Sequence, residues 1–565
     1  MISAGRLAIS LALAGSTLGM NVQNPNIRLP SSAAANKAAV QKIFTDSYAA
    51  YKEFAFGHDD LSPVSQSFSD GRNGWGATIV DAMSTMKIMG LNASHFRGRD
   101  LFNEAVNFTA NIDFSRSQTS DTVSVFETTI RYLGGLLSAY ELSNQQFPIL
   151  LQKATEVGDK LAFAWVGNND IPFGFLDFST NTPQIATSNI AEAGTLSLEF
   201  ETLSKHTGNQ TYLGLALKSV SHIANLVCIT LARQVLMPHQ GCSRQLTLSS
   251  GLAAQGIDPA SGEFVGGYVT WGGGSDSYFE YLIKHARLSN TNDNTFADTW
   301  HTAVDSSLKN LQRTSTVGNH LYLADFDDSR TIRHIGSHLA CFYGGNWLLG
   351  GKLLNNQTIV NTALQLVDGC WNTYAGDATG IGPEAFAYIS ADGNFTGGGN
   401  PSADQIAFYK KHGYYITASD YILRPEVLES NFYAFRVTGD TKYLDRAASA
   451  VASFNKFLRT PTGFAGLNDV NSLNGGLIDD TESFWFAEVL KYLYLTFDDP
   501  NHISIDKFVF NTEAHPFIAP PAKPVYGSVN SIRAPLGPFT LKTGPPLPAI
   551  SPIPRLPKQI PVPPQ

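Results

Sequence analysis

The sequence has few cysteines, few charged residues and no long apolar run. Only 4 of its 565 residues are cysteines, so the chain is not a small scaffold held together by several disulfides. Charged residues make up 15% of the chain and the net charge is −9, which argues against a nucleic-acid-binding protein because such a protein needs a basic face. The apolar stretch Leu7–Gly15 is shorter than the roughly 20 residues that a membrane-spanning helix requires, and no later segment qualifies.

Several catalytic signatures are also missing. The chain has no His-Glu-x-x-His sequence, no phosphate-binding P-loop, no dinucleotide-binding fingerprint and no Gly-x-Ser-x-Gly nucleophile elbow. The glycine run Gly397–Gly399 lacks the strand and helix that a phosphate-binding loop needs on its two sides. These absences disfavour metalloproteases, nucleotide-dependent enzymes and α/β-hydrolases.

What the sequence does contain is enough apolar material for a large core. Hydrophobic residues make up 43% and aromatic residues 11% of the chain, which excludes general disorder. At the N-terminus, Arg6 is followed by the apolar stretch and then by small residues, the order that is typical of a secretory signal peptide. We therefore expect residues 1–19 to be a signal peptide, with a short signal-anchor as the alternative. Either predicts a protein that is secreted or lies in the lumen of the endoplasmic reticulum or Golgi.

Secretion predicts glycans, and it permits disulfides. Five asparagines begin an Asn-x-Ser/Thr sequon and are candidate glycosylation sites: Asn92, Asn107, Asn209, Asn356 and Asn394. Cys228 and Cys242 could pair or remain as buried thiols, and the sequence does not decide between these. A bond between Cys341 and Cys370 would close a loop of about 30 residues, which stabilises a fold by about 3–4 kcal/mol in the chain-entropy model.

From about residue 36 to 497 the apolar residues recur at helical spacing. Typical helical segments are Val123–Leu142, Thr195–Leu203, Ile332–Leu354 and Glu482–Thr496, and we count about fourteen in all. Between helices the pattern Thr-Gly followed by Asn or Asp recurs, at Thr207 and again at Thr438, which predicts a helix end and a new start. Fourteen helices in pairs predict seven helical hairpins, either closed into a barrel or stacked as a solenoid. The segment 518–565 is rich in proline and basic residues, and we expect a disordered tail there.

Acidic residues inside apolar helical runs are the strongest indication of function, because charged residues are seldom fully buried unless paired or bound to metal. Taken singly, each is explained by an ordinary salt bridge on a helix surface. Taken together, so many predict one acidic pocket, which suits glycoside hydrolysis, where one carboxylic acid protonates the leaving oxygen and a second carboxylate assists. Such a pocket would also attract a hard cation such as calcium. The acids in question are Glu127, Glu199, Asp276, Glu280, Glu384, Glu426, Glu429, Glu482 and Glu488.

The chain resembles glycoside hydrolase family 47, the class I α-1,2-mannosidases, and especially their secreted fungal members. The resemblance covers about residues 36–517 and is carried by several motifs in order. These are Gly74-Trp-Gly-Ala-Thr-Ile-Val-Asp81, the segment Val123–Ala139 with its Phe-Glu-Thr-Thr-Ile-Arg core, Asp276-Ser-Tyr-Phe-Glu-Tyr-Leu282, Leu423-Arg-Pro-Glu426, Glu482-Ser-Phe484 and Phe510-Asn-Thr-Glu-Ala-His-Pro516.

The resemblance implies an all-α fold: an (α/α)7 barrel of seven helical hairpins, with short β-hairpins and a C-terminal segment that plugs the barrel. It implies a catalytic domain over residues 33–517. The implied activity is calcium-dependent, inverting hydrolysis of terminal α-1,2-linked mannose from high-mannose N-glycans, by a monomer. A second interpretation, a lectin-like quality-control factor of the same fold with little or no hydrolase activity, also stays open, as does a glucoamylase-like hydrolase on an (α/α) barrel.

The resemblance also implies roles for single residues. Glu127 matches the general acid, directly or through a water, Glu426 matches the base, and Asp276 matches a third essential carboxylate that competes with Glu127 for the acid role. Thr512 matches the calcium ligand, and Cys341 and Cys370 match a disulfide. The residues implied in substrate binding are Arg131, Glu199, His338, Glu384, Arg424, Glu429 and Glu482, although His338 taken alone is typical of a core histidine.

Two departures from the family pattern bear on specificity. Ser84 stands where many members have aspartate. Gly274 stands where members restricted to a single cleavage carry arginine, and a glycine there leaves room for other glycan branches. We therefore expect this chain to remove several α-1,2-mannoses.

Overall fold

The computed structural model describes residues 21–91, 100–236 and 251–528. The expected signal peptide, Asn92, Cys242 and most of the expected tail lie outside these ranges. In the described residues no helix is both long and apolar enough to cross a membrane.

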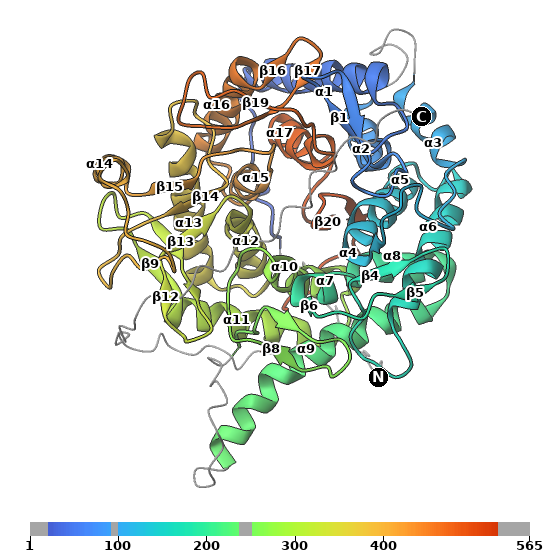
Figure 1. Cartoon of the computed structure of the whole chain (residues 1–565), viewed down its shortest axis with the longest axis horizontal. Coiled ribbons are helices and arrows are strands. Elements are labelled where there is room, and N and C mark those ends of the chain that lie inside the picture. The colour runs from blue at the N-terminus through green and yellow to red at the C-terminus, as the bar shows by residue number, and fades with distance from the viewer. Residues whose placement is uncertain (1–20, 92–99, 237–250, 529–565) are drawn as a thin grey trace, which may run out of the picture.

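Seven helices form a closed inner ring around the axis of the molecule (Figure 1). Each contacts the next, and the last returns to the first through the π-helical segment η4 (Trp485–Val489) that precedes it. The ring consists of α2 (Ala77–Met89), α5 (Gly134–Leu142), α8 (Ser197–Thr207), α10 (Asp276–Ser289), α12 (Tyr343–Leu353), α15 (Glu426–Thr438) and α17 (Leu490–Phe497).

A second helix layer covers the ring from outside. Each outer helix packs against the inner helix that precedes it in the chain, and the first outer helix packs against the last inner helix, α17. The described residues thus form seven inner–outer helix pairs, and the predicted (α/α)7 barrel is confirmed. The outer helices are α1 (Ala33–Phe54), α3 (Leu101–Thr109), α6 (Pro148–Leu161), α9 (Gln210–Leu236), α11 (Thr295–Asn310), α13 (Gln357–Gly376) and α16 (Lys442–Phe457).

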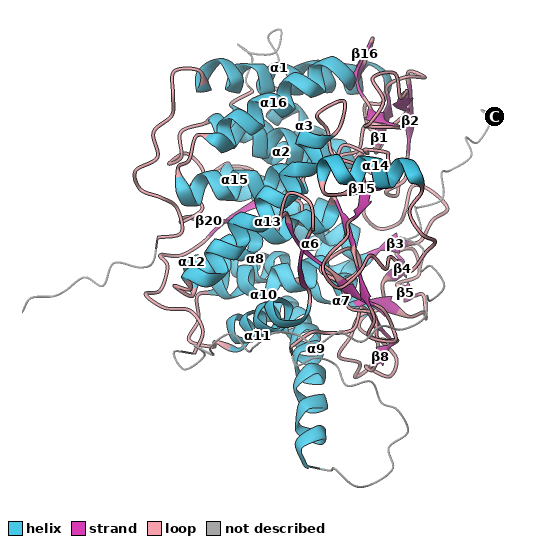
Figure 2. Ribbon diagram, turned by 90° about the vertical axis from the view of Figure 1, so that its left-hand side faces the viewer, coloured by secondary structure: helices cyan, strands magenta, loops and turns pink. Residues whose placement is uncertain are grey.

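Short antiparallel strands gather mainly on one side of the barrel, as Figure 2 shows. The pairs and triplets are β1 (Asp60–Ser62) with β2 (Ser67–Ser69); β3 (Val123–Ser124), β4 (Phe175–Asp177) and β5 (Thr182–Pro183); β6 (Ser188–Asn189), β7 (Gly256–Ile257) and β8 (Phe264–Val265); β9 (Gln312–Thr314) with β10 (Leu321–Leu323); β11 (Asp325–Phe326) with β12 (Ile332–Arg333); β13 (Ile335–Ser337), β14 (Ala385–Ala387) and β15 (Tyr415–Ala418); β16 (Arg459–Thr460) with β17 (Gly463–Phe464); and β18 (Gly466–Leu467) with β19 (Leu477–Ile478). Because every inner helix follows an outer one, the inner helices run in the same direction and their first residues share one end of the barrel.

The C-terminal hairpin of β20 (Phe508–Phe510) and β21 (Pro516–Ile518) inserts its turn among the inner helices, as the resemblance implies. The Asn511 amide donates to the carbonyl of Ile130 at 2.9 Å, and His515 lies 3.0 Å from the Ser84 hydroxyl. Gly134 permits this insertion, because a Cβ at that position would come within 2.6 Å of the Asn511 side chain. The turn therefore closes the barrel with polar contacts to several inner helices.

The helix ends predicted at Thr-Gly are confirmed. Gly208 and Gly439 have φ values of 76° and 75°, and their N–H groups bond to the preceding helical turn. The helix predicted over Ile332–Leu354 is wrong in its first part. Strands β12 and β13 occupy Ile332–Ser337 and α12 begins only at Tyr343, because Gly336 pairs across the sheet with Phe386, a contact that helical spacing does not reveal.

The chain beyond the C-terminal hairpin continues along the barrel surface to the last described residue. The N–H of Ile518 donates to Glu141 at 2.6 Å, Tyr526 is buried and donates to Asn290, and Ser528 bonds to Asp298. The part of the predicted tail that is described is thus packed against the barrel.

Four of the candidate glycosylation sites are described. Asn107, Asn209 and Asn394 are exposed, whereas Asn356 is half-buried and caps the start of α13 by accepting from two backbone N–H groups.

Candidate active site

The fold brings the three candidate catalytic carboxylates to the shared end of the inner helices. Asp276 and Glu426 are the first residues of α10 and α15, and Glu127 ends the short helix α4 (Val125–Glu127) directly after strand β3. Each is half-buried, so each is partly open to the space at this end of the barrel.

Glu127 is held by two arginines. Arg131 Nε donates to its carboxylate at 2.7 Å, and Arg72 Nη1 lies 3.1 Å from the same oxygen. Burial works to raise the pKa of Glu127, but the two guanidinium charges outweigh it and the pKa is lowered. Glu127 is therefore kept ionised.

Arg131 lies in the π-helical segment η1 (Thr128–Leu133), which continues into α5. Besides Glu127, its guanidinium contacts Glu513 and lies 3.5 Å from Asp81. Carboxylates lie on several sides of Arg131, and the residue is only 5% exposed. Its buried charge therefore holds these carboxylates in place.

The pKa of Asp276 is shifted in the opposite direction. Burial, aided by the negative charges of Glu280 and Glu426, raises its pKa to about 7, although the N–H of Ser277 donates to it at 2.7 Å. A carboxyl group with this pKa retains its proton through much of the range near neutral pH.

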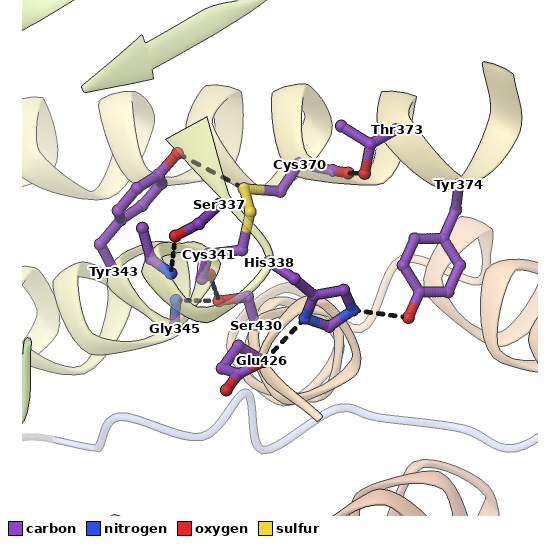
Figure 3. The surroundings of a disulfide bond; sticks show 11 residues. Ser337, His338, Cys341, Tyr343, Gly345, Cys370, Thr373, Tyr374, Glu426 and Ser430 are labelled. Atoms are coloured by element: carbon purple, nitrogen blue, oxygen red, sulfur yellow. Dashed lines mark hydrogen bonds and ion pairs between the residues drawn. A yellow bond between two sulfur atoms is a disulfide. The ribbon is translucent and has the colours of Figure 1, made fainter. Parts of the chain in front are cut away.

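Glu426 lies beside a histidine. The Nδ1 atom of His338 lies 2.7 Å from its carboxylate (Figure 3). Arg424 Nη1 lies 3.6 Å from the same carboxylate. Burial raises the pKa of Glu426, yet the hydrogen bond from His338 and the charge of Arg424 outweigh this and lower it. The other ring nitrogen of His338 lies 2.8 Å from the hydroxyl of Tyr374, so both nitrogens are used within the protein and the side chain orients Glu426.

The predicted disulfide is confirmed and lies next to this pair. Cys341, one turn after His338, is bonded to Cys370 with their Cα atoms 5.9 Å apart. Cys370 and Tyr374 are both on α13, one helical turn apart, so the disulfide joins the two segments that hold the imidazole (Figure 3).

The other acids expected in substrate binding lie in the same region. Glu384 bonds to Arg424 at 2.5 Å. Burial raises the pKa of Glu429 to about 8, and Glu280 and Glu426 add to this while Lys284 opposes it. Burial likewise raises the pKa of Glu199 to about 7, and one of its oxygens has no hydrogen-bond partner among the described residues.

Thr512 lies half-buried in the turn of the C-terminal hairpin. Its N–H donates to the hydroxyl of Tyr281 at 3.2 Å, and that hydroxyl in turn donates to Glu199 at 2.6 Å. Burial raises the pKa of the adjacent Glu513 well above its usual value, and that of Glu488 in η4 in the same way, with the charge of Glu513 adding to the latter. Thr512 thus lies beside Glu513 and is linked to Glu199 through the Tyr281 hydroxyl.

Residues 43–519 match the model for Glycosyl hydrolase family 47. The chain belongs to this family of glycosidases. The probable mannosyl-oligosaccharide alpha-1,2-mannosidase 1B of Aspergillus clavatus is 39% identical to it over 533 residues, which cover 90% of this chain and 98% of that protein. The mannosyl-oligosaccharide alpha-1,2-mannosidase 1B of Aspergillus phoenicis is 38% identical over 496 residues, 85% of this chain and 90% of that protein. The solved structure of the alpha-1,2-mannosidase from Trichoderma reesei has a TM-score of 0.78 at 37% identity and covers 86% of this chain and 99% of that chain.

Three residues of this family 47 site escaped sequence reasoning. Arg72 comes from a polar loop with no apolar spacing around it, and Tyr374 looks like an ordinary aromatic residue on a helix. Asp81 lies within the motif that ends at that position, but nothing local distinguishes it as a partner of Arg131 and His515, from which it lies 3.5 and 3.2 Å away.

Proposed function

We propose that this family 47 protein hydrolyses terminal α-1,2-linked mannose from high-mannose N-glycans, with calcium and with inversion at the anomeric carbon. The observation that supports it most is that the pKa values of two carboxyls at one end of the barrel are shifted in opposite directions. The pKa of Glu426 is lowered while that of Asp276 is raised to about 7. Inverting hydrolysis needs this pair, an ionised base and a protonated acid.

The proposed reaction is a single displacement. Ionised Glu426 accepts a proton from a water molecule as the water oxygen bonds to the anomeric carbon. The bond from that carbon to the leaving oxygen breaks, and Asp276 gives its proton to the leaving oxygen. Between the two candidates for the acid we assign Asp276, because Glu127 lies between two guanidinium groups that stabilise its ionised form.

The residues near Thr512 fit a hard cation. Its backbone carbonyl and hydroxyl offer the oxygen ligands that calcium prefers, and a positive charge there would favour the ionised form of the adjacent Glu513, whose pKa burial raises well above its usual value. Among the described residues, no three His, Cys, Asp or Glu side chains are placed to hold a metal, so the proposed ion is held by Thr512 and by water. Bound calcium would clamp sugar hydroxyls.

We further propose that several α-1,2-mannoses are removed. Gly274 carries no side chain toward the site, and its φ of 85° together with the amide of Gln255, 2.8 Å from where a Cβ would stand, opposes any larger residue. We also propose the secretory lumen or medium as the location, a monomer as the working form, and residues 33–517 as the catalytic domain.

The test of the proposed function is mannose release from mixed high-mannose N-glycans, with and without a calcium chelator. We expect several mannoses to be released and the chelator to abolish release. Loss of a single mannose would contradict the broad specificity. No release with calcium supplied and glycan bound would favour the lectin-like alternative.

Replacing Thr512 by alanine should lower the affinity for calcium as its main effect. The change removes one of two proposed ligand oxygens, and losses around a metal site typically cost about 10–100-fold in affinity. Calorimetric titration with calcium measures this directly. The matched control is Thr299→Ala on the outer helix α11, because the Thr299 hydroxyl donates to the carbonyl of Thr295 one turn earlier. Equal calcium affinity in both variants would contradict the role of Thr512.

A further inference from the structure

Arg72 reaches the candidate active site from a loop outside the helix ring. Its N–H donates to Asp59 at 2.7 Å and its carbonyl accepts from the hydroxyl of Tyr132 at 2.9 Å. Tyr132 follows Arg131 directly in η1. The loop is therefore fixed to the same helical segment that carries the other arginine of the clamp.

The guanidinium of Arg72 bridges two carboxylates of the pocket. Nη1 lies 3.1 Å from Glu127, and Nη2 lies 3.0 Å from Glu482. The Arg72 side chain is only 9% exposed, so water screens these ion pairs far less than pairs on the surface. A planar guanidinium suits two carboxylates at once, which a lysine does not.

We propose that Arg72 is a positioning residue, which holds Glu127 as an oriented, ionised carboxylate between itself and Arg131. The inference rests on the proposed function and deepens it: Glu127 then accepts hydrogen bonds from the bound sugar or a water, and Asp276 alone delivers the proton.

The charges around the clamp support this assignment. Glu127 contacts both guanidinium groups. The acids around the clamp are more numerous than these two cations, so they cannot all be ionised at low cost. Burial raises the pKa of Asp60 and Asp480 well above their usual values, so these groups are the ones that retain protons. The charged and titratable groups that face the clamp are Asp59, Asp60, Asp81, Arg131, Tyr132, Glu192, Asp480, Glu482 and Glu513.

The experiment measures kcat/KM against pH for the full chain and for Arg72→Gln. Removing one adjacent positive charge should raise the pKa of Glu127 by about 1 unit or more, because an opposite charge at this range shifts a carboxyl pKa by about 1–3 units. The low-pH side of the profile, its acid limb, should therefore move to higher pH by about one unit. At a given pH on that limb, kcat/KM should fall by about 10-fold. Near neutral pH the loss should be smaller.

Two further variants separate the loss of charge from other effects of the substitution. Arg72→Lys retains a charge but reaches one carboxylate at a time, so it should move the limb in the same direction by less. Arg116→Gln, at a neighbouring side chain that is 67% exposed, is the matched control and should leave the profile unchanged. Thermal unfolding identifies which variants fold.

An unmoved acid limb in the folded variants at position 72, or an equal loss at every pH, would overturn the inference. Failure of the proposed function looks different, because the unchanged protein would then release no mannose. In that case the clamp is tested by unfolding free energies of Arg72→Gln, Glu127→Gln and the double variant. If the loss of unfolding free energy in the double variant differs from the sum of the two single losses, the clamp is supported. If the two losses add, the inference is overturned.

Discussion

Replacing Glu426 by glutamine is expected to slow mannose release by about 10²–10⁴-fold, the usual contribution of a general base. The amide is nearly the same size as the carboxylate and can still bond to His338, so the barrel should fold as before. It cannot accept a proton from the attacking water at neutral pH. Glycan binding should stay close to that of the unchanged protein, and single-turnover rates together with binding isotherms separate the two quantities.

A matched control is Glu156→Gln on the outer helix α6, where the glutamate forms a partly exposed ion pair with Lys153. It removes the same charge from the surface and should leave the rate unchanged. Turnover near normal in Glu426→Gln would refute the base assignment. Loss of glycan binding together with turnover would show that Glu426 mainly holds the sugar.

Local patterns in the sequence were enough to predict the helices but not their closure into a ring. Helical spacing and the Thr-Gly ends at Gly208 and Gly439 depend on neighbours in the chain, which is why they could be predicted. Whether α17 returns to α2 depends on contacts between residues about 400 positions apart, such as Thr85 with Phe486. That part of the fold came from the family resemblance, and the structure confirms it.

The wrong start of the helix at Ile332 has a related cause. Apolar residues at Ile332 and Ile335 have helical spacing, yet they also fit two short strands. The choice between these depends on β14, a partner about 50 residues further along the chain. Similarly, the π-helical segments that carry Arg131 and Glu488 leave no mark in an apolar pattern.

The acids of the pocket were predictable because a carboxylate in an apolar helix is unusual, whereas their partners were not. A residue such as Arg72 lies in a polar loop, where an arginine is ordinary, and only the folded chain brings it to Glu127. Sequence therefore identifies the groups that react more readily than the groups that set their charge.

The pH dependence of the reaction should report Asp276. Its pKa is raised to about 7, chiefly by burial, so the proton needed by the leaving oxygen is present below this pH and is lost as the pH rises through it. Activity should fall on the alkaline side with a midpoint near that value. On the acid side activity should fall only at low pH, because the pKa values of both Glu426 and Glu127 are lowered and both carboxylates stay ionised until then.

Asp276→Asn tests this assignment most directly. The asparagine has no proton to give, so kcat should fall by about 10²–10⁴-fold for a natural glycan. For a mannoside whose leaving group needs no protonation, the loss should be much smaller, since the base at Glu426 is untouched. The alkaline limb should disappear from the residual activity. If the limb persists in Asp276→Asn but disappears in Glu127→Gln, then Glu127 supplies the proton, and its two arginines must release it when substrate binds.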